Sequence, residues 1–78
     1  MAEVIVYSTE ACPYCHMLKD YLKEKGVSFK DIDVAADEAK AKEMTEKSGQ
    51  MGVPVADIDG EIVVGFNKAE VNRLLKIS

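Results

Sequence analysis

The spacing of apolar residues divides the first third of the chain into a strand and a helix. Residues 4–7 are an uninterrupted apolar run, which predicts a buried strand. Over residues 13–25 the apolar side chains recur at helical intervals, at Leu18, Tyr21 and Leu22. Pro13 suits the first position of this helix, because its φ is already helical and the missing N–H has no partner there. Cys12 therefore falls at the helix start.

The middle of the chain continues with a second strand and a second helix. Gly26 provides the left-handed position that commonly follows a helix end. Residues 27–34 then predict a strand whose charged positions are typical of a protected sheet edge. Residues 36–48 are rich in Ala, Glu, Lys and Met and predict a helix, which Gly49 ends. In this helix we expect Met44 to be a core residue.

Two short apolar runs near the C-terminus predict a β-hairpin. Residues 55–58 and 61–64 flank Asp59 and Gly60, a pair that tolerates the positive φ angles of a two-residue type I′ turn. In that register Val55 pairs with Val64 on one face of the hairpin, and Ala56 pairs with Val63 on the other. Both faces are then apolar, so we expect helices to cover both sides of the sheet.

The last helix begins at Asn67, with Glu70 placed as a capping-box partner. Its apolar stripe consists of Val71, Leu74 and Leu75. The full order is strand, helix, strand, helix, strand, strand, helix. With a right-handed crossover between the first two strands, it predicts an α/β fold with a four-stranded mixed sheet and helices on both faces.

Two cysteines stand at the start of the first helix, in the stretch Cys12-Pro13-Tyr14-Cys15-His16. The unpaired N–H groups and the positive dipole end of a helix favour a thiolate at Cys12. Cys15 is one turn further along, on the same helix face, so its sulfur can reach Cys12 and close a disulfide. The pair can thus cycle between dithiol and disulfide, and we expect Cys12 and Cys15 to be catalytic.

Size and charge restrict the other possibilities. The chain has 78 residues and only two cysteines, which predicts a single domain over residues 1–78 that is not held by structural disulfides. It shows no signal-peptide pattern and no apolar run of membrane-spanning length, so we expect a cytoplasmic protein. The net charge of −4, with acids and bases interspersed, predicts neither nucleic-acid nor membrane binding. We expect a monomer.

Two metal-centred alternatives use the same residues. The pattern of Cys12, Cys15 and His16 is also that of covalent c-type haem attachment, but the predicted strands do not suit such a cytochrome. The same three side chains are candidate zinc ligands, yet a structural site needs four, and no second pair exists. We therefore expect no metal and no haem, and we interpret His16 as a surface residue.

The Cys-Pro-Tyr-Cys stretch, in this position, resembles the active site of the glutaredoxins, a family with the thioredoxin fold. The resemblance extends to Gly52-Val53-Pro54 and Gly65-Phe66-Asn67. It implies a thioredoxin-like, glutaredoxin-type fold and a thiol-disulfide oxidoreductase that uses glutathione as co-substrate to reduce glutathionylated and disulfide-bonded proteins. It also implies a cis proline at Pro54 and a backbone pairing of Val53 with substrate. The implied glutathione-binding residues are Tyr14, Val53, Pro54, Gly65, Phe66 and Asn67.

Three positions depart from the common glutaredoxin pattern. Thr9 stands where a lysine is frequent, Phe66 where a second glycine is frequent, and Lys68 where an acid is frequent. The Gly65-Phe66 pair resembles instead the small redoxins that reduce ribonucleotide reductase and are recharged by thioredoxin reductase. That function is the alternative to a glutathione-dependent one.

Overall fold

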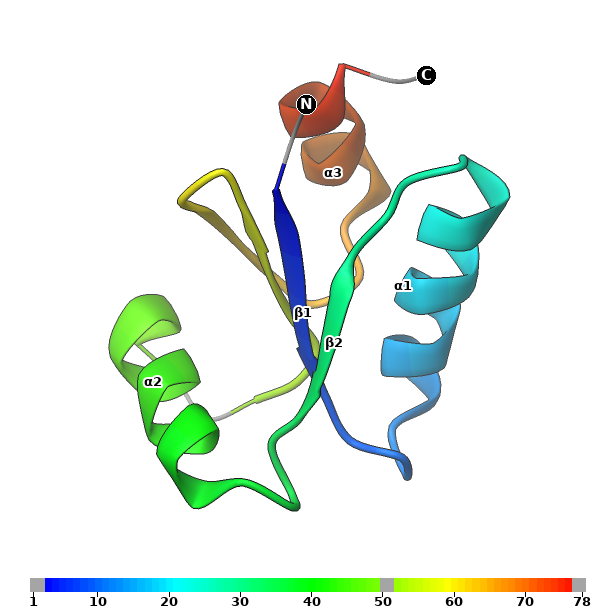
Figure 1. Cartoon of the computed structure of the whole chain (residues 1–78). Helices are drawn as coiled ribbons and strands as arrows, with labels where there is room; N and C mark the ends of the chain where they lie inside the picture. Colours follow the sequence, from blue (N-terminus) through cyan, green and yellow to red (C-terminus); the bar gives the residue numbers. More distant parts are fainter. Residues whose placement is uncertain (1–2, 50–51, 77–78) are drawn as a thin grey trace.

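Four strands form one mixed sheet in the order β2-β1-β3-β4 (Figure 1). The structure is a computed structural model and describes residues 3–49 and 52–76, so the predicted domain ends, residues 1 and 78, lie outside the described residues. The elements are β1 (Val4–Ser8), α1 (Pro13–Glu24), β2 (Lys30–Asp33), α2 (Glu38–Ser48), β3 (Val55–Ile58), β4 (Glu61–Val64) and α3 (Lys68–Leu75). Strand β1 pairs parallel to β2 and antiparallel to β3, and β3 pairs antiparallel to β4. The predicted element order and mixed sheet are confirmed.

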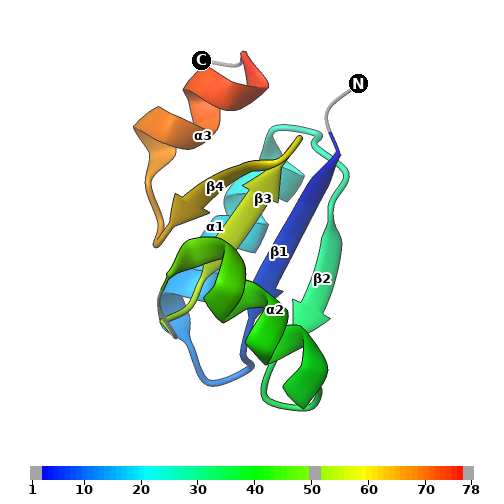
Figure 2. The ribbon, with the colours of Figure 1, turned by 90° about the vertical axis from the view of Figure 1, so that its left-hand side faces the viewer.

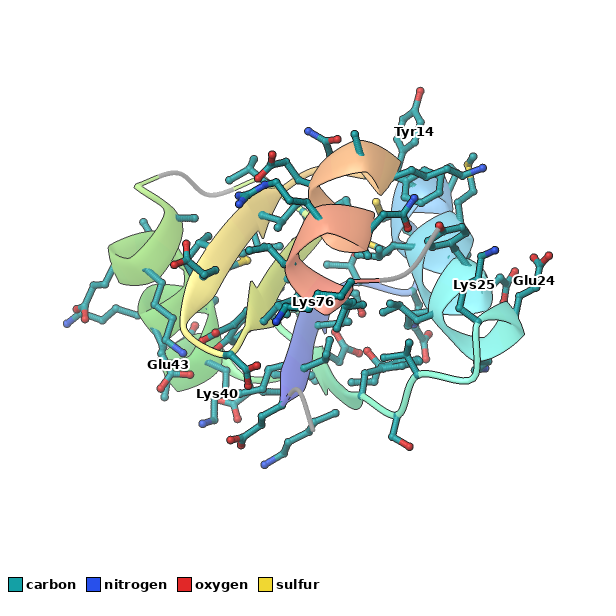
Figure 3. All side chains as sticks on the ribbon, turned by 90° about the horizontal axis from the view of Figure 1, so that it is seen from above. Tyr14, Glu24, Lys25, Lys40, Glu43 and Lys76 are labelled. Atoms are coloured by element: carbon teal, nitrogen blue, oxygen red, sulfur yellow. The ribbon has the colours of Figure 1, made fainter. Side chains whose placement is uncertain are left out.

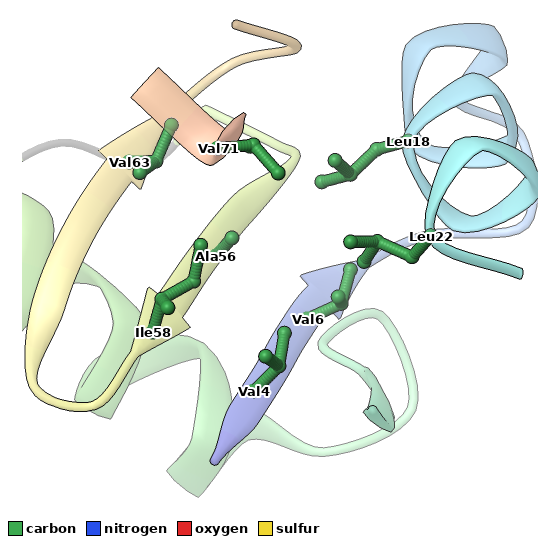
Figure 4. Packing of buried hydrophobic residues seen from close by; sticks show 8 residues of the cluster. All are labelled: Val4, Val6, Leu18, Leu22, Ala56, Ile58, Val63 and Val71. Atoms are coloured by element: carbon green, nitrogen blue, oxygen red, sulfur yellow. The ribbon is translucent and has the colours of Figure 1, made fainter. Parts of the chain in front are cut away.

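Helices α1 and α3 lie on one face of the sheet and α2 lies on the other (Figure 2). The larger core fills the space between the sheet, α1 and α3, where side chains from all these elements point toward one another (Figure 4). Its buried members are Val4, Val6, Leu18, Leu22, Ala56, Ile58, Val63 and Val71. Because alternate residues of a strand point to opposite faces, Tyr7 of β1 belongs to the other side.

The second core, under α2, is smaller and contains Tyr7, Ile32, Met44 and Val55. As predicted, Met44 is a core residue, and it is the buried residue of α2. Polar contacts add to this side: the Tyr7 hydroxyl donates to Glu43 (2.8 Å), and Lys47 donates to both Tyr7 (3.0 Å) and Asp57 (2.8 Å). Helix α2 is therefore attached to the sheet both through Met44 and through charged and hydroxyl groups.

Two predicted boundaries were too wide. Strand β2 begins at Lys30, not at residue 27, because the chain first completes a C-terminal cap of α1: Gly26 is left-handed, and Val27 N–H donates to the Leu22 carbonyl (2.9 Å). Helix α2 begins at Glu38, not at residue 36, because the Asp37 side chain caps it by accepting from the Lys40 N–H.

The hairpin has the predicted register and turn. Val55 pairs with Val64 and Ala56 with Val63, and both turn residues, Asp59 and Gly60, have positive φ. The expectation that both faces of the hairpin are covered was wrong at Val64, which is 44% exposed. Strand β4 is at the edge of the sheet. Among the described residues, no helix has the length and hydrophobicity needed to cross a membrane.

Candidate active site

The sulfur of Cys12 caps the first turn of α1. Cys12 has an extended backbone, Pro13 follows at the first helical position, and the Cys15 N–H donates to Cys12 Sγ over 3.3 Å. Because this N–H is one of the donors that a helix start leaves unpaired, the sulfur takes the place that a serine or aspartate oxygen usually has. Cys12 is partly exposed, so a disulfide in solution can reach it. The predicted position of Cys12 is confirmed.

Cys15 lies one helical turn behind Cys12 and is fully buried. Burial raises the pKa of the Cys15 thiol to about 11, and the hydrogen bond with the Cys12 sulfur acts in the same direction. The Thr9 backbone and the Lys19 ammonium oppose that shift. Neither cysteine is in a disulfide, so the structure shows the dithiol form. The two thiols thus have different surroundings, one open to reagents and one protected and protonated at neutral pH.

The loop before β3 brings a backbone carbonyl to the thiol. Cys12 Sγ lies 3.8 Å from the Val53 oxygen, and the Val53-Pro54 peptide bond is cis, as the resemblance implied. The Pro54 carbonyl accepts a hydrogen bond from the Gly65 N–H (2.8 Å). Residues from three distant parts of the sequence, Cys12, Val53 and Gly65, are therefore joined at one end of the sheet.

Two further predicted site residues, Tyr14 and Asn67, lie at the starts of α1 and α3. Tyr14 is 61% exposed and projects from the start of α1 (Figure 3). Asn67 caps α3, since its side chain accepts from the Glu70 N–H over 3.2 Å. In a capping box the Glu70 carboxylate would accept from the Asn67 N–H. Here the Glu70 carboxylate instead makes a bidentate ion pair with Arg73.

Phe66 and Lys68 fill the space where a Gly-Gly pair would leave the start of α3 open. The Phe66 ring packs edge-on against Tyr21 with centroids 6.1 Å apart. Lys68 Nζ lies over both rings, 5.2 Å from the Tyr21 centroid and 5.7 Å from that of Phe66. A shallow groove between α1 and α3 is lined by Met17, Asp20, Tyr21, Glu24, Phe66 and Lys68. The residue before Asn67 and the first residue of α3 therefore both pack against α1.

A polar group behind Cys15 was not anticipated from the sequence. Lys19 Nζ donates to Asp31 (3.1 Å), and the buried Ser8 hydroxyl donates to the other oxygen of the same carboxylate (2.8 Å). Burial acts to raise the pKa of Asp31, but the bonds from Ser8 and Lys19 outweigh it and lower that pKa. Lys19 follows Cys15 by four residues, and this spacing was the available signal. The part played by Asp31 becomes visible only with the β1–β2 register.

His16 is exposed, and its Nε2 lies 2.7 Å from the Glu10 carbonyl oxygen. Over residues 3–49 and 52–76, no three His, Cys, Asp or Glu side chains are grouped as metal ligands would be.

A mixed four-stranded sheet with a dithiol at the start of α1 and a cis proline beside it defines a thiol-disulfide oxidoreductase of the thioredoxin-like fold class. The sequence profile of the glutaredoxin family matches residues 4–63, and the chain belongs to that family.

Similar proteins of known sequence or structure are also glutaredoxins or glutaredoxin-like proteins. The chain is 51% identical over 71 residues to a glutaredoxin-like 8.6 kDa protein in the rubredoxin operon of Clostridium pasteurianum, covering 91% of this chain and 95% of that one. It is 43% identical over 65 residues to glutaredoxin 3 of Escherichia coli K12, covering 83% and 78%. The crystal structure of a glutaredoxin from Archaeoglobus fulgidus superposes with a TM-score of 0.88 at 28% identity, covering 97% and 88%.

Proposed function

We propose that this protein reduces protein–glutathione mixed disulfides and protein disulfides, with Cys12 as the nucleophile and Cys15 as the resolving thiol. One observation carries the proposal. The Cys12 sulfur is partly exposed at the start of α1, where the Cys15 N–H donates to it, and it faces the Val53 carbonyl. The thiolate is the attacking species in disulfide exchange, and Cys12 is the thiol of the pair that a disulfide in solution can reach.

The reaction has two routes after a common first step. The Cys12 thiolate attacks one sulfur of the substrate disulfide, a bond forms between them, and the other substrate sulfur leaves as a thiolate. In the monothiol route a glutathione thiolate attacks the Cys12–glutathione disulfide and releases Cys12 and oxidised glutathione. In the dithiol route Cys15 attacks Cys12 Sγ, the bound substrate thiol leaves, and the Cys12–Cys15 disulfide remains. In the dithiol route the substrate gains two electrons and the cysteine pair loses them, whereas in the monothiol route the electrons come from glutathione, which leaves in its oxidised form.

We assign glutathione binding to Tyr14, Val53, Pro54, Gly65, Phe66 and Asn67. The Gly65–Pro54 hydrogen bond supports this grouping, since it brings the start of α3 close to the loop that faces Cys12. In this proposal the backbone of Val53 pairs with the extended tripeptide, and N–H groups at the start of α3 hold its γ-glutamyl carboxylate. We further propose a cytoplasmic location, where thiols are kept reduced.

The second candidate is a redoxin that is recharged by thioredoxin reductase and donates electrons to ribonucleotide reductase. The Gly65-Phe66 pair supports it, because it resembles that class of redoxin and because Phe66, packed against Tyr21, stands where glutaredoxins commonly have a second glycine. The first step at Cys12 is the same in both candidates. They differ in which thiol or enzyme returns the protein to its dithiol form.

Replacing Cys15 by serine separates the two routes. Cys15→Ser should keep most of the activity toward a small glutathione mixed disulfide, since glutathione itself can release Cys12. The same variant should lose nearly all reduction of protein disulfides such as insulin. Cys12→Ser should lose both activities and serves as the control. An inactive Cys15→Ser protein with the glutathione mixed disulfide would contradict the monothiol route.

The recharging system is tested by measuring NADPH consumption with glutathione plus glutathione reductase and, separately, with thioredoxin reductase. The glutathione-dependent proposal expects turnover in the first assay to exceed that in the second. Turnover with thioredoxin reductase alone would support the second candidate.

A further inference from the structure

Lys19 is the charged side chain of α1 that lies nearest the protected thiol in sequence and on the same helix face. It follows Cys15 by four residues, and side chains at that spacing are neighbours, with Cβ atoms about 5–6 Å apart. Its side chain is only 16% exposed, although lysine side chains are rarely buried. The Asp31 carboxylate holds its Nζ, and the Ser8 hydroxyl in turn holds Asp31. The cation is thus fixed beside the interior of the site.

One step of the dithiol route places a negative charge on Cys15. To attack Cys12 Sγ, the Cys15 thiol must lose its proton, and the negative charge then forms at a sulfur that is fully buried. Desolvation opposes a buried thiolate, and an opposite charge nearby favours it. The electron pair of Cys15 forms the new bond to Cys12, the bond from Cys12 to the substrate sulfur breaks, and the departing substrate thiolate takes up a proton.

We propose that Lys19, held in place by Asp31 and Ser8, stabilises the Cys15 thiolate and so promotes the resolving step without acting on the nucleophile Cys12. The inference rests on the proposed function, because it concerns the second step of that reaction. Asp31 and Ser8 are positioning residues in this scheme, since they contact Lys19 or each other and not the reacting sulfurs.

The other groups around Cys15 support this assignment. Among the described residues, Cys15 is influenced by the Cys12 sulfur and by Lys19 from α1, and by the Thr9 backbone from the loop after β1. Burial and Cys12 raise the pKa of Cys15, and Lys19 lowers it. From β2, Asp31 faces Lys19, and the next lysine of α1, Lys23, acts on Asp31. When Cys12 enters a mixed disulfide it carries no charge, so it no longer raises the pKa of Cys15 by charge repulsion. The effect of Lys19, which lowers that pKa, persists.

The test uses a symmetrical aromatic disulfide whose released thiolate is coloured, mixed rapidly with the reduced protein. Attack by Cys12 releases the first thiolate in a phase whose rate depends on reagent concentration. Closure by Cys15 releases the second in a phase that does not. Lys19→Gln removes the charge but keeps a side chain that can hydrogen bond to Asp31. Lys19→Arg keeps the charge, and Lys23→Met removes one exposed positive charge on the next turn as a matched control.

We expect Lys19→Gln to shift the pH midpoint of the second phase upward by about one unit, at the lower end of the range for a nearby charge. A tenfold smaller thiolate fraction, partly offset by the greater nucleophilicity of a more basic thiolate, should leave the second phase about threefold slower at neutral pH. The first phase should be unchanged. Lys19→Arg should restore the midpoint, and Lys23→Met should behave as the original protein.

Two results would overturn the inference. One is an unchanged second phase in Lys19→Gln, and the other is an equal slowing of both phases, which indicates a general disturbance of α1. Failure of the proposed function has a different signature: the original protein would then release only one thiolate, because Cys15 would not resolve the Cys12 adduct.

Discussion

Two thiols of the same chemical type are given different roles by their positions in one helical turn. Cys12 is at the open end of α1, and Cys15 is fully buried behind it with a pKa of about 11. This contrast follows from the helix geometry. A residue at the cap is outside the packed face of the helix, whereas the residue three positions later is buried on that face, together with Leu18 and Leu22.

Alkylation of the reduced protein should therefore label one thiol. At pH 8, iodoacetamide should modify Cys12 and leave Cys15 nearly untouched, because a thiol with a raised pKa stays protonated until the pH approaches that value. Labelling of Cys15 should increase only as the pH approaches about 11. Peptide mapping by mass spectrometry after brief labelling measures both sites. Equal labelling of the two cysteines at pH 8 would contradict this assignment of roles.

Lys68 should affect glutathione use only weakly. Its ammonium lies over the rings of Tyr21 and Phe66 at an exposed position. Under the proposed function it would attract the γ-glutamyl carboxylate of glutathione and repel the ammonium of the same group. Exposed charge pairs contribute at most about 1 kcal/mol. Lys68→Asp should change the Michaelis constant for a glutathione mixed disulfide only a few-fold, and less in high salt because exposed charges are screened. Steady-state kinetics at two salt concentrations measure this, and a change above about tenfold would show that Lys68 has a larger role.

At the scale of the elements, α2 depends on polar contacts more than the other helices do. Lys47 pairs with Asp57, a residue that is 8% exposed, and also donates to Tyr7. The bonds to Asp57 and Tyr7 raise the pKa of Lys47, so its ammonium stays charged over the whole neutral range. The helix ends at Ser48, shortly before the loop that carries Val53. The contacts of Lys47 therefore hold α2, the helix that precedes the Val53 loop, against the sheet.

Lys47→Met should lower the free energy of unfolding by about 1–3 kcal/mol, because it leaves the Asp57 carboxylate buried without its cationic partner. Lys42→Met, an exposed position on the same helix, should change stability by less than about 0.5 kcal/mol. Urea denaturation followed by circular dichroism gives both values. Equal stabilities for the two variants would indicate that the Lys47–Asp57 pair contributes nothing measurable.

The elements and the two thiols could be predicted from the sequence because their signals are local. The helix start at Cys12, the Asp59-Gly60 turn and the cap at Asn67 each depend on a few neighbouring residues. The contacts that require distant segments to meet were missed. Lys19 pairs with Asp31, and Lys47 with Asp57, only because particular strands are adjacent in the sheet. Such charged residues look like solvated surface in a sequence, since most of them are.

At the scale of the whole molecule, the sheet separates two cores of unequal size. Among the residues that the structure describes, the cluster on the side of α1 and α3 has eight buried members and the cluster on the side of α2 has four. Helix α1 buries Cys15, Leu18 and Leu22, whereas α2 buries Met44. Since burying one large apolar side chain contributes about 1.5–3 kcal/mol, α2 is attached less strongly to the sheet than α1.

This asymmetry should appear in native-state hydrogen exchange of the reduced protein. Amides of α2 should exchange through an opening with a free energy about 2 kcal/mol below that for the amides of α1, because one large buried side chain is the least difference between the two helices. Lys47→Met should lower the opening free energy of α2 further by removing the Asp57 pair.

Added osmolyte separates a local effect from a global one. If exchange from α1 reports only global unfolding, its free energy should follow the stability of the whole protein. The free energy of a separate opening of α2 should stay lower in Lys47→Met even when osmolyte restores the global stability. Equal exchange free energies and equal denaturant dependence for the two helices, in both proteins, would mean that the molecule opens as one unit. In that case the polar attachment of α2 would be as firm as the apolar packing of α1, and the loop carrying Val53 could not move independently of the helix that carries Cys12.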